Sequence, residues 1–249
     1  MQKKQDNVDA IFKVDQINED FVFNDRVARV FDDMLDRSIP FYSEVILSIA
    51  RIFESLLDDG VKVVDLGCAT GATILQLSRL LEEKSLLYTG IDNSQAMLDQ
   101  ATLKAELFSK QDRLTFIRED IMDLHQTGTS AFILNYTLQF IRPLYREGFL
   151  KQLYDNLIPG GICILSEKII SHHPRLNRSY IDIYHQLKKE RGYSELEIAK
   201  KREALENVLI PCSMEENRSM LHSAGFIEVE PFFQWFNFVS FLAIKPPLT

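Results

Sequence analysis

One carboxylate and a group of small residues stand together at the end of an apolar run. Asp65 follows this β-branched run, and the next positions include Gly67, Cys68, Ala69 and Gly71. A strand, a tight turn of small residues and a helix N-terminus let a backbone approach a nucleoside closely. The spacing Gly-x-Ala-x-Gly differs from the Gly-x-Gly-x-x-Gly fingerprint of nicotinamide dinucleotide sites, so it favours S-adenosyl-L-methionine as the cofactor.

Further polar residues follow the next three apolar runs. The Asp92 carboxylate, with Asn93 beside it, is placed to accept both ribose hydroxyls of a nucleoside. Asp120 can accept the adenine amino group while Ile121 covers the ring, and Asn135 would lie beneath a sulfonium. Taken alone, Asp65 could cap the following turn, Asp92 could cap the next helix and Asp120 could be a plain surface acid. Their recurrence at four successive strand ends favours the cofactor.

These residues each follow a predicted strand. Apolar runs predict strands at residues 62–66, 86–92, 114–118, 131–136 and 162–165, with helical spacing between them. Strands that alternate with helices imply a parallel, doubly wound sheet. Ligands bind such sheets outside the carboxyl ends of the strands, which would bring the polar residues together.

The remaining segments complete the predicted fold. Helical spacing over 25–57 is interrupted at Pro40, which predicts two helices. Residues 169–209 are predicted to be mostly helical and are highly charged. Two strand-like runs, at 227–236 and 238–245, are so close together that they must pair as a hairpin. We therefore expect an α/β fold: a doubly wound, Rossmann-like methyltransferase sheet of about seven strands with a C-terminal antiparallel hairpin, N-terminal helices and a helical insertion before the hairpin. Residues 1–249 would form a single methyltransferase-like domain, with a polar N-terminal arm over 1–20 and the insertion over 169–209.

Composition excludes several classes of function. The chain has 249 residues and a formal net charge of −8, which argues against a broad contact with nucleic-acid phosphates. Its three cysteines are scattered without metal-ligand spacing, and we expect the adjacent histidines at 172 and 173 to lie in a polar linker. There is no run of about 18 apolar residues and no apparent leader segment. We expect a reduced, cytoplasmic protein without a metal, a membrane span or direct nucleic-acid binding.

Several longer motifs resemble a single family. Beside Asp-x-Gly-Cys-x-x-Gly-Ala at 65–72, they are Ile-Asp-Asn-Ser at 91–94, Leu-Asn-Tyr-Thr-Leu-Gln-Phe at 134–140, Leu-Ser-Glu-Lys at 165–168, Gly-Tyr-Ser-Glu-Leu-Glu at 192–197 and Phe-Gln-Trp-Phe-Asn-Phe at 233–238. The chain resembles the carboxy-S-adenosyl-L-methionine synthases, bacterial enzymes of tRNA wobble-uridine modification. The resemblance extends over about residues 21–245.

This resemblance implies a reaction unlike methyl transfer. Prephenate would lose its carboxyl group and become phenylpyruvate, and S-adenosyl-L-methionine would gain that group on its methyl carbon. In the mechanism implied by the family, the hydroxide that leaves prephenate removes a methyl proton, and the resulting ylide captures carbon dioxide. Such chemistry requires a water-poor pocket and a cation for the migrating carboxylate.

The resemblance also implies roles for particular residues. In the motif over 200–203, Arg202 would hold the migrating carboxylate, for which a planar guanidinium is well suited, although such basic runs are usually solvated helix faces. Tyr42 would contact the cofactor, although a packing aromatic is the alternative without the family. The apolar face of the insertion resembles the dimer-forming region of the family and predicts a homodimer, unless it packs on its own sheet; its residues are Tyr180, Ile183, Tyr184 and Leu187.

Three other functions remain open on the sequence. An ordinary S-adenosyl-L-methionine-dependent methyltransferase acting on a small molecule would share every cofactor residue and differ only in the insertion and Arg202. A catalytically silent binding partner is a second alternative. A nicotinamide-dependent oxidoreductase is the third, but the glycine spacing and the terminal hairpin argue against it.

Overall fold

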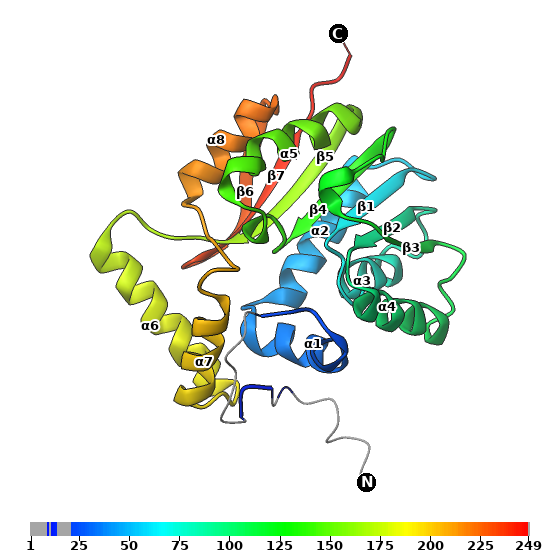
Figure 1. Cartoon of the computed structure of the whole chain (residues 1–249). Helices are drawn as coiled ribbons and strands as arrows, with labels where there is room; N and C mark the ends of the chain where they lie inside the picture. The colour runs from blue at the N-terminus through cyan, green and yellow to red at the C-terminus, as the bar shows by residue number, and fades with distance from the viewer. Residues whose placement is uncertain (1–8, 10, 14–20, 249) are drawn as a thin grey trace.

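A single seven-stranded sheet organises the computed structural model, which describes residues 9, 11–13 and 21–248 (Figure 1). The strand order is β3-β2-β1-β4-β5-β7-β6. The strands are β1 (Lys62–Leu66), β2 (Leu87–Asp92), β3 (Leu114–Arg118), β4 (Thr129–Asn135), β5 (Leu157–Lys168), β6 (Glu228–Trp235) and β7 (Phe238–Ile244). Strands β1 to β5 pair in parallel, whereas β7 is antiparallel to both β5 and β6. The predicted fold class, including its C-terminal antiparallel hairpin, is therefore confirmed.

Eight α-helices and three short 3-10 helices surround the sheet in the described residues. The α-helices are α1 (Asp25–Ser38), α2 (Tyr42–Leu56), α3 (Ala72–Leu80), α4 (Gln95–Leu107), α5 (Pro143–Asn156), α6 (Pro174–Glu190), α7 (Glu195–Leu205) and α8 (Met214–Ala224). The 3-10 helices are η1 (Ile11–Lys13), η2 (Ile121–Asp123) and η3 (Leu138–Phe140). The expected N-terminal helices are α1 and α2, and the helical insertion contains α6 and α7, which lie to one side of the sheet with α1 (Figure 1).

The core lies on both faces of the sheet because alternate strand residues point to opposite sides. Val63 of β1 packs with α2 and α3, whereas the next residue, Val64, packs in the cluster that includes α5 and α8. Both valines are fully buried. Burial on two faces explains why the parallel strands are nearly continuous apolar runs rather than alternating ones.

Local signals set the helix ends. Ser94 caps α4 by accepting a hydrogen bond from the Met97 amide at 3.3 Å. Ser213 and Glu216 form a reciprocal capping box at the start of α8. Gly225 ends α8 with φ of 118°, a left-handed conformation that favours glycine.

Most of the predicted N-terminal arm, residues 1–20, lies outside the described residues. Three of its side chains are described, and all three are buried. Phe12 and Ile11 join an apolar cluster with α1, while Asp9 is 1% exposed. The Tyr193 hydroxyl donates a hydrogen bond to the Asp9 carboxylate. This part of the arm therefore packs against α1 and the segment that precedes α7.

Candidate active site

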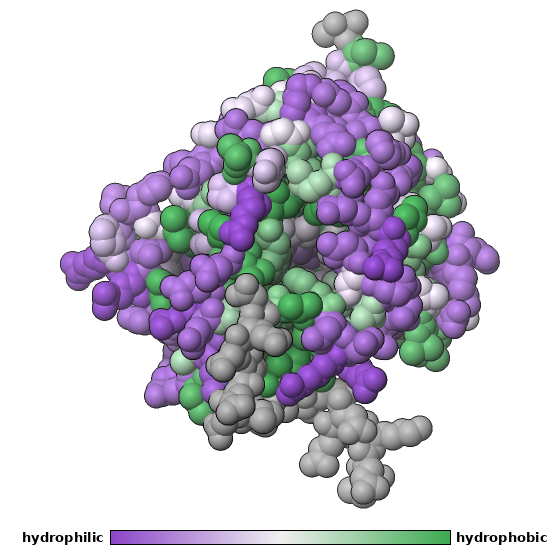
Figure 2. Space-filling model, in the orientation of Figure 1, coloured by the Kyte–Doolittle hydropathy of each residue, from purple (hydrophilic) through white to green (hydrophobic). Residues whose placement is uncertain are grey.

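A cavity of about 760 Å³ opens at the carboxyl ends of the parallel strands. The strand order reverses around β1, which pairs with β2 on one side and with β4 on the other. Ligands of open α/β sheets bind at such a switch point. Helices α1, α6 and α7 supply the outer wall. Figure 2 shows apolar residues gathered around a hollow in the middle of this face.

The glycine loop forms the floor of the cavity. Gly67 has φ of 69°, and its amide donates to the Ile91 carbonyl at 2.8 Å. A Cβ on Gly67 would lie only 2.5 Å from the Thr137 methyl group, so a side chain has no room there. Ala69 also has a positive φ, 46°, and its amide donates to Asp92 at 2.9 Å. The loop thus leaves its backbone open toward the cavity.

Asp65 lies at the end of β1 and faces the cavity. It is 2% exposed, and its Oδ2 atom has no hydrogen-bond partner among the described residues. Burial, together with the nearby Asp92 carboxylate, raises the pKa of Asp65 to about 8. A carboxyl group with so high a pKa is largely protonated at neutral pH. It loses the proton and becomes a strong acceptor when a cation or a charged donor lies beside it.

Asp92 ends β2 with both carboxylate oxygens in use. Oδ2 accepts from the Ala69 amide and Oδ1 accepts from the Ser94 amide, each at 2.9 Å. The helix cap itself is Ser94, so the structure does not give Asp92 that role. Each carboxylate oxygen keeps a second lone pair, which can accept from a further donor such as a hydroxyl group. The neighbouring Asn93 is exposed and also lines the cavity.

Asp120 and Ile121 line the cavity beyond β3. Asp120 caps η2, because its Oδ1 accepts from the Met122 amide at 3.0 Å. It is exposed, as the alternative of a plain surface acid requires, whereas Ile121 is half-buried. The predicted pair for the adenine ring therefore lies at the rim of the cavity, and the capping role of Asp120 was not predicted.

Tyr42 and Asn135 meet at a residue that the sequence analysis missed. Thr73, in the first turn of α3, lies 3.0 Å from the Tyr42 hydroxyl and accepts a hydrogen bond from Asn135 Nδ2 at 3.1 Å. Asn135 Oδ1 has no partner among the described residues. Burial raises the pKa of Tyr42 above its ordinary range, so the phenol keeps its proton. A small hydroxyl just after the glycine loop was the available signal for Thr73.

The opposite end of the cavity is basic. Arg202 on α7 is exposed and lines it, and in the described part of the chain its guanidinium makes no hydrogen bond or ion pair. Lys168, His185, Lys188 and Lys201 line the same end and were not predicted as site residues. They come from β5, α6 and α7, whereas Asp65, Asp92 and Asp120 belong to the other end. The cavity therefore has an acidic half and a basic half.

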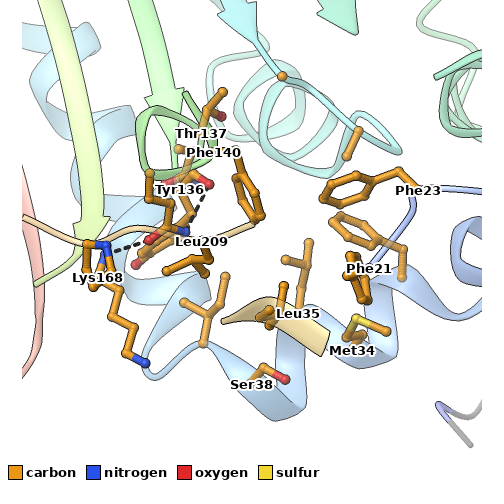
Figure 3. A pocket seen from close by; sticks show the side chains of 18 of the residues that line it. Phe21, Phe23, Met34, Leu35, Ser38, Tyr136, Thr137, Phe140, Lys168 and Leu209 are labelled. Carbon is orange, nitrogen blue, oxygen red and sulfur yellow. Dashed lines mark hydrogen bonds between the residues drawn. The ribbon is translucent and has the colours of Figure 1, made fainter. Parts of the chain in front are cut away.

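Aromatic rings close much of the remaining wall (Figure 3). Phe21 and Phe23 are in contact with ring centres 5.1 Å apart, and Phe23 meets Phe140 at 5.6 Å. These rings line the cavity together with Tyr136, whose hydroxyl is buried. Apolar walls exclude water and strengthen electrostatic interactions with a bound ligand.

The structure also bears on the reactivity of Cys68, on metal binding and on membrane spanning. Burial and the nearby carboxylates raise the pKa of the Cys68 thiol well above its ordinary value, so a thiolate nucleophile is disfavoured. Within the described residues, no group of three or more His, Cys, Asp or Glu side chains is placed to hold a metal ion. Of the helices that the structure describes, none has the length and apolar character needed to cross a membrane.

Several known proteins are similar to this chain, some in sequence and others in fold. A family described as "Methyltransferase domain" matches residues 63–161. The carboxy-S-adenosyl-L-methionine synthase of Desulfotalea psychrophila is 56% identical over 97% of this chain and 98% of its own length. The enzyme of that name from Nautilia profundicola is 48% identical over 92% of this chain and 96% of its own. Human N-acetylserotonin methyltransferase, solved in complex with S-adenosylmethionine, is similar in fold with a TM-score of 0.61 at 16% identity, covering 89% of this chain and 55% of that one.

Proposed function

The chain belongs to the carboxy-S-adenosyl-L-methionine synthase family, and we propose that it makes this compound with prephenate as the carboxyl donor. The enzyme is a transferase, and S-adenosyl-L-methionine is its substrate. Prephenate would leave as phenylpyruvate. The carboxylated product would then serve as the carboxymethyl donor for 5-oxyacetyl modification of a tRNA wobble uridine.

The proposed reaction balances without another reactant. Prephenate loses its ring carboxyl group as carbon dioxide and its ring hydroxyl as hydroxide, and the ring becomes aromatic. The hydroxide takes one proton from the methyl group of S-adenosyl-L-methionine and leaves as water. The methyl carbon forms a new bond to the carbon dioxide. The sulfonium supplies the acidity of that methyl group, so the protein need only hold the two substrates and exclude water.

The acidic half of the cavity fits S-adenosyl-L-methionine. Asp65 Oδ2 and Asn135 Oδ1 are acceptors without a partner among the described residues, which suits the ammonium and sulfonium of this substrate. Asp92 would accept the ribose hydroxyls, and Asp120 with Ile121 would hold the adenine. Gly67, Cys68, Ala69 and Asn93 would contribute the loop surface, and Tyr42 would bind through its hydroxyl.

A single observation carries the choice of carboxyl transfer over methyl transfer. The Arg202 guanidinium lines the same cavity as Asp65 and Asn135, and no carboxylate of the described residues is paired with it. A methyl acceptor needs no such cation, whereas a migrating carboxylate does. Arg202 would bind that carboxylate with two parallel hydrogen bonds.

Mass spectrometry after incubation with S-adenosyl-L-methionine and prephenate tests the donor. We expect a product heavier than the substrate by one carbon dioxide, and isotope from the prephenate ring carboxyl should appear in it. Methyl transfer to an acceptor without this product would establish the ordinary methyltransferase instead. No turnover by the wild type with any acceptor would favour a silent binding partner.

Two variants test the role of Arg202. Arg202→Ala should reduce product formation by more than about 100-fold, and Arg202→Lys should recover only part of it, because an ammonium lacks the planar pair of donors. Arg178→Ala is the matched control, since Arg178 is exposed on α6 and does not line the cavity. Unchanged turnover in Arg202→Ala would remove the proposed role of this residue.

We also propose a homodimer in the cytoplasm. Of the apolar α6 face named above, Tyr184 packs inside its own chain and donates a hydrogen bond to the Ser38 carbonyl at 2.9 Å. The Tyr180 ring lies 5.3 Å from that of Phe236 in its own chain, whereas Ile183 and Leu187 remain for an interface, beside the exposed Leu176. Light scattering should give a mass of two chains, and Ile183→Asp should lower it.

A further inference from the structure

Three lysines alternate with two tyrosine rings along the basic wall of the cavity. The Lys168 ammonium lies 5.2 Å from the centre of the Tyr184 ring, and the Lys188 ammonium lies 4.7 Å from the same centre. Lys188 is also 6.0 Å from the Tyr193 ring, which Lys201 approaches to 5.1 Å. All three lysines line the cavity. The rings separate the positive charges and partly stabilise them through their π-electrons.

Within the residues that the structure describes, Lys201 is the one of these three lysines with an acidic partner in an ion pair. Lys201 lies 3.7 Å from Asp9 Oδ2 and donates to Ser38 Oγ at 2.9 Å. Lys188 is 6% exposed, yet among residues 9, 11–13 and 21–248 its ammonium makes contacts only with aromatic rings. The Lys168 ammonium likewise has no hydrogen bond or ion pair within that part of the chain.

A buried ammonium without a counterion is costly, because its lost hydration is not replaced. Burial and the charges of Lys201 and Lys168 lower the pKa of Lys188 well below its ordinary value, and the charge of Asp9, which is already paired with Lys201, offsets this only in part. An anion that enters the cavity would relieve both effects. Lys188 and Lys168 are therefore available to bind a negatively charged group of the ligand.

The proposed donor brings two carboxylates into the cavity. Only its ring carboxyl group is transferred, and Arg202 is assigned to that group. The carboxylate of the keto-acid side chain stays on the phenylpyruvate product, so it needs a cation that Arg202 does not supply. Lys188 and Lys168 share the basic half with Arg202, since the charges of all three lower the pKa of His185.

We infer that Lys188 and Lys168 form a second carboxylate subsite, which binds the keto-acid carboxylate that the donor keeps. This inference rests on the proposed function, because it assumes an anionic donor with two carboxylates. The subsite would select keto acids over neutral ketones. It would also hold the reacting ring beside the methyl group while the other carboxyl group migrates.

The complex with carboxy-S-adenosyl-L-methionine allows this subsite to be tested separately from Arg202. With carboxy-S-adenosyl-L-methionine bound, Arg202 is occupied by the transferred carboxylate, so phenylpyruvate must find its cation elsewhere. Calorimetry would compare phenylpyruvate with phenylacetone, in which a methyl group replaces the carboxylate. We expect the wild type to bind phenylpyruvate with at least about 10-fold higher affinity than phenylacetone, because hydrogen bonds between charged groups are strong in a buried site.

Lys188→Met should remove most of this preference and raise the KM for prephenate by about 10-fold or more. Its affinity for S-adenosyl-L-methionine should remain within about threefold of the wild type, which also shows that the variant folds. Lys188→Arg should keep the preference for phenylpyruvate. The control is Lys189→Met, because Lys189 is adjacent in sequence but donates to Glu195 at 2.6 Å and does not line this cavity.

The outcomes separate this inference from the proposed function. A wild type that forms no product from prephenate would defeat the proposed donor. A wild type that uses prephenate, with an unchanged phenylpyruvate preference and KM in Lys188→Met, would overturn the subsite alone. If Lys188→Met does not fold, Lys168→Gln decides the same question: a reduced preference for phenylpyruvate would support the subsite, and an unchanged preference would overturn it.

Discussion

Binding of S-adenosyl-L-methionine should release a proton from Asp65. In the free protein the pKa of this carboxyl is raised to about 8, because it is buried and lies near Asp92. At about pH 6.5 nearly every molecule therefore carries the proton. The positive charges of the substrate favour the carboxylate, so binding expels almost one proton per site. In Asp65→Asn there is no such proton to release.

The size of the effect follows from the pKa. Ionising the carboxyl costs about 1.4 kcal/mol for each pH unit below its pKa. The affinity for S-adenosyl-L-methionine should therefore rise about 10-fold per unit between about pH 6 and pH 8 and level off above that. In Asp65→Asn the affinity should be weaker at about pH 8 and change far less with pH.

Calorimetry in two buffers of different ionisation enthalpy measures the proton count directly. The amino group of the substrate is the same for both proteins, so the difference between the wild type and Asp65→Asn reports the carboxyl alone. Equal proton release by the two proteins would refute the reasoning. The same pKa predicts that the free energy of unfolding of the free wild type decreases as the pH rises from about 4 to about 8, since the folded state holds a proton that the unfolded chain has lost.

Two further variants test the walls of the site. Gly67→Ala should lower the free energy of unfolding by about 2–4 kcal/mol, because the new Cβ meets Thr137 and the backbone has a positive φ; urea unfolding measures this, and no recovery in combination with Thr137→Ser would contradict the steric cause. Asp9→Asn should lower the pKa of Lys201 below its present value of about 8, since the carboxylate raises it. The folded variant would then bind fewer protons than the unfolded chain already below pH 8, so between about pH 7 and pH 8 the stability of Asp9→Asn should rise more steeply with pH than that of the wild type. Equal slopes in urea unfolding at several pH values would count against the contact.

The sequence predicted the parallel strands and their helices closely because burial and local caps encode them. The predictions for β1 and β3 match their observed bounds, and α4 begins after Ser94, a residue type that favours the N-cap position. The fifth strand is longer than predicted, since it begins at Leu157 rather than at residue 162. The Pro-Gly-Gly at 159–161 is typical of a turn, but Leu157 pairs with Thr129 before the register shifts.

The two halves of the site differed in how well the sequence predicted them. The acidic half consists of residues at strand ends, which a parallel sheet brings to one edge whatever else the chain does. Lys188 and Lys201 lie on highly charged helices, where a lysine is usually solvated. The burial of Lys201 depends on Asp9, which lies at the other end of the chain, and no local pattern encodes a contact between segments so far apart.

The contact between Asp9 and Tyr193 also bears on the order in which the protein folds. These residues are 184 positions apart, so the loop that their contact closes comprises most of the chain. Closing so long a loop is entropically costly, and contacts of this kind form late in folding. During synthesis the residues of the acidic half emerge first, whereas the basic half cannot be completed until α7 has left the ribosome. In a nascent chain the residues proposed to bind S-adenosyl-L-methionine would thus be in place well before those proposed to bind the carboxyl donor.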